Sequence, residues 1–161
     1  MSLEKVDECS KFLIRQGFTI AFAESATAGR ICSEFALAHN AGKFFKGGIV
    51  CYDGCIKQDL LKVPEDLIKQ FTPESEEVTE AAALGLRKLI PADIHVAVTG
   101  LTAKGGSETS EKPVGTIFIH GVMDKKMFSE RCLFEGDKEQ ILVQTVERVA
   151  SLVLERLFFL Y

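Results

Sequence analysis

The hydrophobic positions along this chain form two kinds of segment: helix-spaced faces and short continuous apolar runs typical of buried strands. A helix-compatible face over residues 6–14 should end at Gly17, where a left-handed glycine can stop a helix. An apolar strand follows over residues 18–23. The chain therefore opens with a helix that leads directly into a strand.

Further segments continue the same alternation. A second helix should direct Ile31, Phe35 and Leu37 into the core and fray near residues 39–42, which have a helix-stop composition. We expect strands over residues 47–53, 94–100, 115–122 and 127–134, a turn at 124–126, and helical pieces over 56–61, from Pro64, over 75–89 and over 138–157.

Strands that alternate with helices, followed by a hairpin and a closing helix, predict an α/β fold. We expect a three-layer α/β/α sandwich with a mixed, mostly parallel sheet, formed by residues 1–161 as a single domain. In such sheets, ligands bind where several strand ends release loops on one edge. The loops after Ala23, Asp53 and Gly100 are therefore expected to converge.

Composition narrows the classes of protein that the chain can belong to. Of its residues, 47% are hydrophobic and 26% charged, and no apolar run approaches the roughly 20 residues that a membrane helix needs. The acidic start over residues 1–8 lacks the features of a secretory signal, so we expect a cytoplasmic protein. A net charge of −4 argues against a nucleic-acid surface. A small-molecule ligand fits better.

The chain has five cysteines, an odd number that argues against a disulfide framework in a cytoplasmic protein. Cys51 and Cys55 could begin a metal site, but no second close pair follows, and the histidines are scattered. We therefore expect reduced, mostly buried thiols and no metal.

The turn after the first strand concentrates polar side chains. Glu24, Ser25 and Thr27 lie between the strand and the second helix. Free backbone N–H groups and the helix dipole favour an anionic ligand at such a turn. Alternatively, Ser25 serves only as the N-cap of the helix.

The loop over residues 100–115 is long and polar, and loops of this length usually have a function or are disordered. Gly105, Gly106 and Ser107 could form a nest of N–H groups around a phosphate or carboxylate, with Lys104 or Lys112 adding positive charge. A mobile surface loop would have the same composition.

Tyr52, Asp53 and Lys57 follow the predicted strand that ends at residue 53. An exposed lysine here would only be a solvated charge. A lysine that is partly desolvated beside a hydroxyl can instead lose its proton near neutrality and act as the base for a serine nucleophile. The sequence alone leaves both possibilities open.

Four motifs resemble, in order and spacing, those of one known family. The turn Ala23-Glu-Ser-Ala-Thr-Ala-Gly29 is similar to the family's Ala-Glu-Ser-Cys-Thr-Gly-Gly, and residues 45–57 resemble its Phe-x-x-Gly-x-Val-x-Tyr-x-x-x-x-Lys block. The long loop carries Gly-Gly-Ser at 105–107 and Lys-Pro-Val-Gly-Thr at 112–116, and Phe134-Glu-Gly-Asp137 is similar to the opening of the family's last helix. The chain thus resembles the C-terminal domain of the competence/damage-inducible protein CinA.

This resemblance implies a stand-alone nicotinamide-nucleotide amidohydrolase, which converts nicotinamide mononucleotide to nicotinate mononucleotide and ammonia in pyridine-nucleotide salvage. It implies neither a metal nor another cofactor. Lys57 would be the base, and Tyr52 would position the lysine or the substrate. The residues expected to bind substrate or phosphate, some through their backbone, are Glu24, Gly29, Gly100, Gly105, Gly106 and Ser107.

The nucleophile departs from the family pattern. Counting back three residues from Phe45 places Gly42 where the family has the serine that we would assign to attack. Glycine has no hydroxyl, so hydrolysis would depend on Ser25 or Thr27.

Three functions therefore remain open. The first is an amidohydrolase with a relocated nucleophile, and the second is an inactive pocket that binds a nucleotide or a similar anion. The third is an interaction module that uses the apolar tail 157–161, in line with an expected homo-oligomer. Nucleic acid and membrane are not expected partners.

Overall fold

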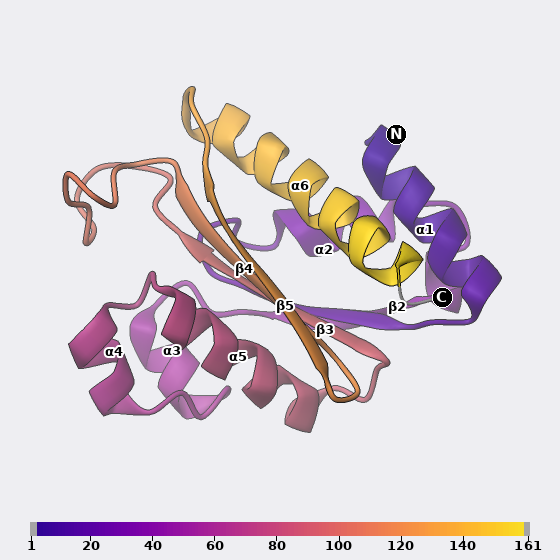
Figure 1. The fold of residues 1–161 in the computed structure, drawn as a ribbon, viewed down its shortest axis with the longest axis horizontal. Coiled ribbons are helices and arrows are strands. Elements are labelled where there is room, and N and C mark those ends of the chain that lie inside the picture. Colours follow the sequence, from indigo (N-terminus) through magenta and orange to yellow (C-terminus); the bar gives the residue numbers. More distant parts are fainter. Residues whose placement is uncertain (1–2, 160–161) are drawn as a thin grey trace.

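A computed structural model describes residues 3–159 and shows a three-layer α/β/α sandwich (Figure 1). Helices α1, α2 and α6 cover one face of the sheet, and α3, α4 and α5 cover the other. The predicted fold class is confirmed. The helices, with a short 3-10 helix η1, are α1 (Glu4–Gln16), α2 (Arg30–Ala36), η1 (Ala41–Lys43), α3 (Gly54–Asp59), α4 (Glu65–Phe71), α5 (Glu76–Leu89) and α6 (Lys138–Phe158).

The sheet has five strands in the order β2-β1-β3-β4-β5. Strands β1, β2 and β3 are parallel, and β3–β4 and β4–β5 pair antiparallel. Only β4 therefore runs against the other strands within residues 3–159, and the carboxyl ends of β1, β2 and β3 meet at one edge. The strands are β1 (Ile20–Glu24), β2 (Phe45–Val50), β3 (Ile94–Gly100), β4 (Thr116–Met123) and β5 (Lys126–Leu133).

Strand β1 is buried along its whole length because helices cover both faces of the sheet. Its side chains alternate between the faces, as the twofold period of a strand requires. Ile20 and Phe22 belong to the core that includes residues of α1 and α6, whereas Ala21 and Ala23 pack with residues of α5. This double burial fixes the register of β1 and the position of the turn that follows it.

Two local expectations were wrong. Leu37 does not face the core: it caps the end of α2 and is 57% exposed, because the helix stops at Ala36. The strand expected over residues 47–53 lies at Phe45–Val50, so the segment from Cys51 to Asp53 leaves the sheet. This shift matters for function because it places Tyr52 in a loop.

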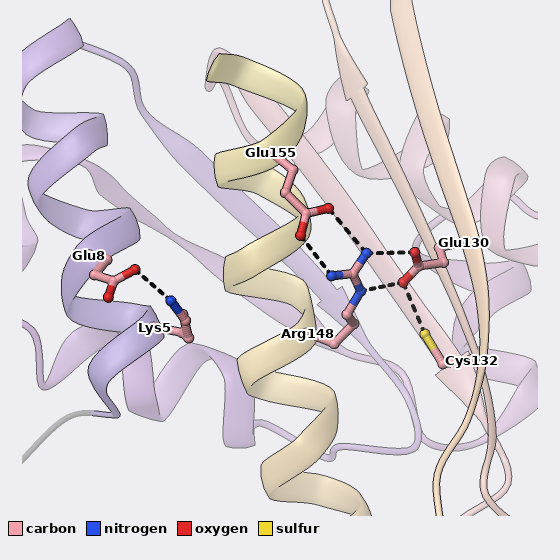
Figure 2. Close-up of polar contacts among 6 residues, drawn as sticks. All are labelled: Lys5, Glu8, Glu130, Cys132, Arg148 and Glu155. Carbon is pink, nitrogen blue, oxygen red and sulfur yellow. Dashed lines mark hydrogen bonds and ion pairs between the residues drawn. The ribbon is translucent and has the colours of Figure 1, made fainter. Parts of the chain in front are cut away.

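Strand β5 forms one edge of the sheet and is tied to α6 by an ion-pair cluster (Figure 2). Arg148 on α6 donates to both carboxylate oxygens of Glu130 on β5, at 2.5 and 2.6 Å, and also pairs with Glu155 at 2.9 Å. A forked contact of this kind is geometrically specific. A charged side chain that is held in this way also discourages the exposed edge from pairing with another chain.

The apolar tail is only partly described. Leu157 is fully buried, and Phe158 and Phe159 are 73% and 86% exposed, while Leu160 and Tyr161 lie outside the described residues. The role of the tail in assembly stays a prediction. Within residues 3–159, no helix combines the length and the apolar character that a bilayer span requires.

Candidate functional site

A pocket of about 280 Å³ lies at the carboxyl edge of the three parallel strands. Each of the three loops expected to converge contributes to it: Ser25 follows β1, Tyr52 follows β2, and Gly100 ends β3. This is the position at which α/β sheets bind ligands. The pocket is lined by Ser25, Ala26, Tyr52, Lys57, Glu74 and residues 100–106.

Ser25 presents a weakly held hydroxyl to this pocket. Its side chain is 4% exposed, and Oγ donates to the carbonyl of Val98 at 3.3 Å, longer than the usual 2.7–2.8 Å of such bonds. The backbone N–H of Ser25 donates to the same carbonyl. Because Gly29 is the N-cap of α2, the simple alternative that Ser25 caps this helix was wrong.

Glu24 is turned away from the pocket and occupies the start of α2. The Glu24 carboxylate is fully buried and accepts from Thr27 Oγ1 at 2.6 Å and from the N–H groups of Ile31 and Cys32 at 2.8 and 2.9 Å. The helix end that could have held a ligand anion therefore binds the chain's own carboxylate. Neither Glu24, Thr27 nor Gly29 lines the pocket.

We predict that Glu24→Gln destabilises the fold by about 2–3 kcal/mol, because an amide cannot accept from both buried N–H groups at its two ends. Chemical denaturation would measure the change. Glu139→Gln is the matched control: Glu139 pairs with Arg30 near the same helix but is 67% exposed, so its loss should cost less than about 0.5 kcal/mol. Equal stability of the wild type and Glu24→Gln would contradict a structural role.

Lys57 lines the pocket and is buried, with an exposed fraction of 1%. Its Nζ donates to the carbonyl of Pro73 at 3.2 Å. Burial lowers the pKa of Lys57 below its ordinary value, while the nearby Cys51 and Glu74 oppose this shift. The solvated-charge alternative was therefore wrong, and a desolvated lysine lies in the same pocket as Ser25.

The long loop folds over the pocket without offering a free anion nest. The N–H of Gly105 donates to the carboxylate of Glu108 at 2.8 Å, and bonds from the backbone of Gly105, Glu108 and Gly106 lower the pKa of that carboxyl. Gly105 and Gly106 still line the pocket, beside Lys104. A ligand phosphate at this nest would have to displace Glu108.

Two other residues of this loop anchor it instead of facing the pocket. Ser107 Oγ donates to Glu74 Oε2 at 2.5 Å, and Lys112 Nζ donates to Thr72 Oγ1 at 2.5 Å and to the carbonyl of Glu74 at 2.8 Å. These bonds hold the loop against the segment between α4 and α5. A mobile surface loop would lack such bonds.

Glu74 is the lining residue that the sequence did not reveal. It lies one residue before Ser75, the N-cap of α5, where an acidic residue usually serves only the helix dipole. Its place in the pocket depends on where the segment between α4 and α5 lies relative to the strand ends, for which the local sequence carries no pattern.

Gly42 lies at the opposite edge of the sheet. It belongs to η1, directly before the amino end of β2, and the carbonyl of Phe44 accepts from the N–H of Ile20 at the start of β1. The six residues of β2 separate it from the pocket, a span of roughly 20 Å at about 3.3 Å per residue. A hydroxyl at position 42 would not enter this chain's pocket.

The cysteines have a smaller role than a metal site would give them. All five are free thiols, and Cys55 is exposed instead of buried as expected. Across residues 3–159, no three His, Cys, Asp or Glu side chains gather into a group that could hold a metal ion. Burial raises the pKa of the Cys51 thiol, and the nearby Lys57 opposes this shift.

Comparison with known proteins agrees with the fold and the motif order. The family model described as CinA C-terminal domain matches residues 3–157. The "CinA-like protein" of Geotalea uraniireducens is 38% identical over 143 residues, covering 88% of this chain and 34% of that protein, and the one of Thermotoga maritima is 36% identical over 155 residues, covering 96% and 36%. The chain thus spans about a third of the length of these curated relatives.

Solved structures also match nearly the whole chain. The competence damage-inducible protein A from Klebsiella pneumoniae superposes with a TM-score of 0.91 at 25% identity, covering 96% of this chain and 95% of that one. The same layers and strand order therefore occur in a protein of similar length.

Proposed function

Because the chain belongs to the CinA C-terminal domain family, we propose that it hydrolyses the carboxamide of nicotinamide mononucleotide, releasing nicotinate mononucleotide and ammonia. The observation that carries this proposal is the buried Lys57 in the same pocket as the Ser25 hydroxyl. A serine beside a lysine of lowered pKa is a known arrangement for acyl transfer.

In the proposed first step, neutral Lys57 takes the proton of Ser25 as Oγ attacks the carboxamide carbon. The carbon–nitrogen bond then breaks, the nitrogen leaves as ammonia with the proton returned by Lys57, and an ester to Ser25 remains. In the second step, water attacks this ester and Lys57 accepts one of its protons. Lys57 returns this proton to Ser25 Oγ as the ester bond breaks, and the carboxylic acid that leaves gives its own proton to the solvent. Lys57 takes up one proton and returns it in each step, so it is neutral again when the step ends.

The rest of the pocket supports this chemistry. The negative oxygen that forms during attack needs N–H donors close to Ser25, and Ala26, the next residue in the chain, lines the pocket and would supply its backbone N–H. Lys104, beside Gly105 and Gly106, would attract the phosphate of the nucleotide. Tyr52 is 63% exposed at the pocket, so its ring can pack against the ligand from the solvent side.

The test is an assay for ammonia release from nicotinamide mononucleotide by the purified chain, with nicotinate mononucleotide identified by chromatography. Equimolar release of both products is the expected result. Free nicotinamide, which lacks the ribose phosphate, should be a poor substrate because it cannot use Lys104. No ammonia above the rate of a Ser25→Ala variant would refute the proposal.

A second candidate function is nucleotide binding without hydrolysis. The bond of the Ser25 hydroxyl to Val98, and not to Lys57, favours it. Calorimetry would distinguish the two functions: binding of nicotinamide mononucleotide with no product after long incubation would identify a binding protein.

A further inference from the structure

Two lysines bond to the backbone at Pro73 and Glu74. Lys57 Nζ donates to the carbonyl of Pro73, and Lys112 Nζ donates to the carbonyl of Glu74 itself. Thr72, two residues earlier, has a φ of 73°, a conformation that is costly for a β-branched residue and persists only where the surroundings impose it. The backbone that carries Glu74 is therefore fixed before any ligand arrives.

One of the two oxygens of the Glu74 carboxylate is bound by the long loop. Its Oε2 accepts from Ser107 Oγ, whereas Oε1 accepts no hydrogen bond within the described part of the chain. Glu74 lines the pocket with Lys57 and Ser25. The pocket thus contains a preorganised negative group with a spare acceptor, close to the proposed site of reaction.

We propose that Glu74 makes this pocket select a neutral carboxamide over the corresponding carboxylate. The carboxamide presents an NH₂ group that can donate to Oε1, whereas a carboxylate presents only acceptors and a like charge. Placing like charges together is an effective way to reject a competing ligand. This inference rests on the proposed function. Its consequence is that Glu74 repels the carboxylate product once it forms, so that loss of ammonia is followed by product release.

Glu74 also affects the proposed base. Its negative charge raises the pKa of Lys57, opposing the larger effect of burial. Removing the charge should therefore lower the pKa of Lys57 further and shift the acid limb of the activity profile to lower pH. A residue that only tethered the loop would not move this limb.

Calorimetry on the full chain in a Ser25→Ala background, which prevents turnover, tests the inference with nicotinamide mononucleotide and nicotinate mononucleotide. With Glu74 present, the amide should bind about tenfold or more tightly than the acid. Glu74→Gln keeps the side-chain shape and its bond to Ser107, and should reduce this preference to about threefold or less, chiefly by strengthening binding of the acid.

Two further variants separate the effect of the Glu74 charge from that of its hydrogen bond to Ser107. Ser107→Ala removes the bond to Oε2 but keeps the charge, so it should retain the amide preference, as should Glu74→Asp. An unchanged preference in Glu74→Gln, its loss in Ser107→Ala, or no binding of either nucleotide would overturn the inference. Ammonia release with an unchanged preference would refute only the role of Glu74, whereas a Glu74-dependent preference without ammonia release would refute only hydrolysis.

Discussion

Replacing Lys57 with methionine should reduce ammonia release from nicotinamide mononucleotide by about a thousandfold or more. Methionine fills the buried space of the lysine stem but cannot accept the proton of Ser25, so attack on the carboxamide loses its base. Binding should change far less, because the proposed ligand contacts of Tyr52 and Lys104 do not involve Lys57. The measurement is kcat and KM from a continuous ammonia assay, with the loss expected in kcat.

The pH dependence of the wild type checks the same role. Lys57 must be neutral to act as a base, so kcat should rise with pH through the pKa of this residue, which burial places below its ordinary value of 10.5. This rise of kcat with pH should be absent from the residual activity of Lys57→Met. A flat profile in the wild type would exclude Lys57 as the titrating base.

Lys57→Met should lose activity but gain stability. Because the pKa of Lys57 is lower in the folded protein than in the unfolded chain, the unfolded chain binds more protons between these two pKa values, and the fold gains stability as pH rises through that window. Lys57→Met should therefore be more stable than the wild type at neutral pH, with a gain that disappears above pH 10.5.

Lys69→Met is the matched control. Lys69 is 68% exposed and pairs with Glu65 one turn earlier on α4. Its replacement should leave activity within about twofold of the wild type and alter stability by less than about 0.5 kcal/mol. Equal loss of activity in both lysine variants would indicate damage to the fold and would remove the case for Lys57 as a base.

Much of the fold follows from local sequence because its strands are buried on both faces. The short apolar run Ile94–Gly100 predicts a buried strand, and the structure places β3 over the same residues. Ser75 and Asp137 accept from the N–H groups three residues on, so the starts of α5 and α6 also lie where their caps predict. Gly17, in the left-handed conformation, ends α1 as expected.

The candidate site was harder to predict because it depends on which oxygen binds which donor. The sequence places Glu24 at a helix start, yet only the fold shows that its carboxylate occupies the helix N-terminus, while Ser25 lines the pocket together with two other hydroxyl residues, Tyr52 and Thr102. The same holds for Glu108, which bonds to the Gly105 N–H that had been expected to bind phosphate. In both cases a side chain of the protein takes the place of a ligand anion, and sequence spacing cannot distinguish these outcomes.

Ser25→Ala should abolish ammonia release as completely as the loss of Lys57, and adding a hydroxyl at position 42 should not restore it. The prediction follows from the two edges of the sheet: Ser25 lies in the pocket after β1, whereas Gly42 lies before the amino end of β2. A Cβ added at Gly42 would meet no atom within 4 Å, so Gly42→Ser should fold normally. We expect a loss of about a thousandfold or more in Ser25→Ala and in the double variant Ser25→Ala/Gly42→Ser, with unchanged activity in Gly42→Ser.

Thr27→Val is the control for the neighbouring hydroxyl. Thr27 donates to the buried Glu24 carboxylate and does not line the pocket, so its loss should lower stability by about 1 kcal/mol and leave kcat within a few-fold of the wild type. Activity that survives Ser25→Ala but not Thr27→Val would assign the nucleophile to Thr27. Rescue by Gly42→Ser would instead require a second copy of the chain to bring position 42 to the pocket, because β2 separates the two within one copy.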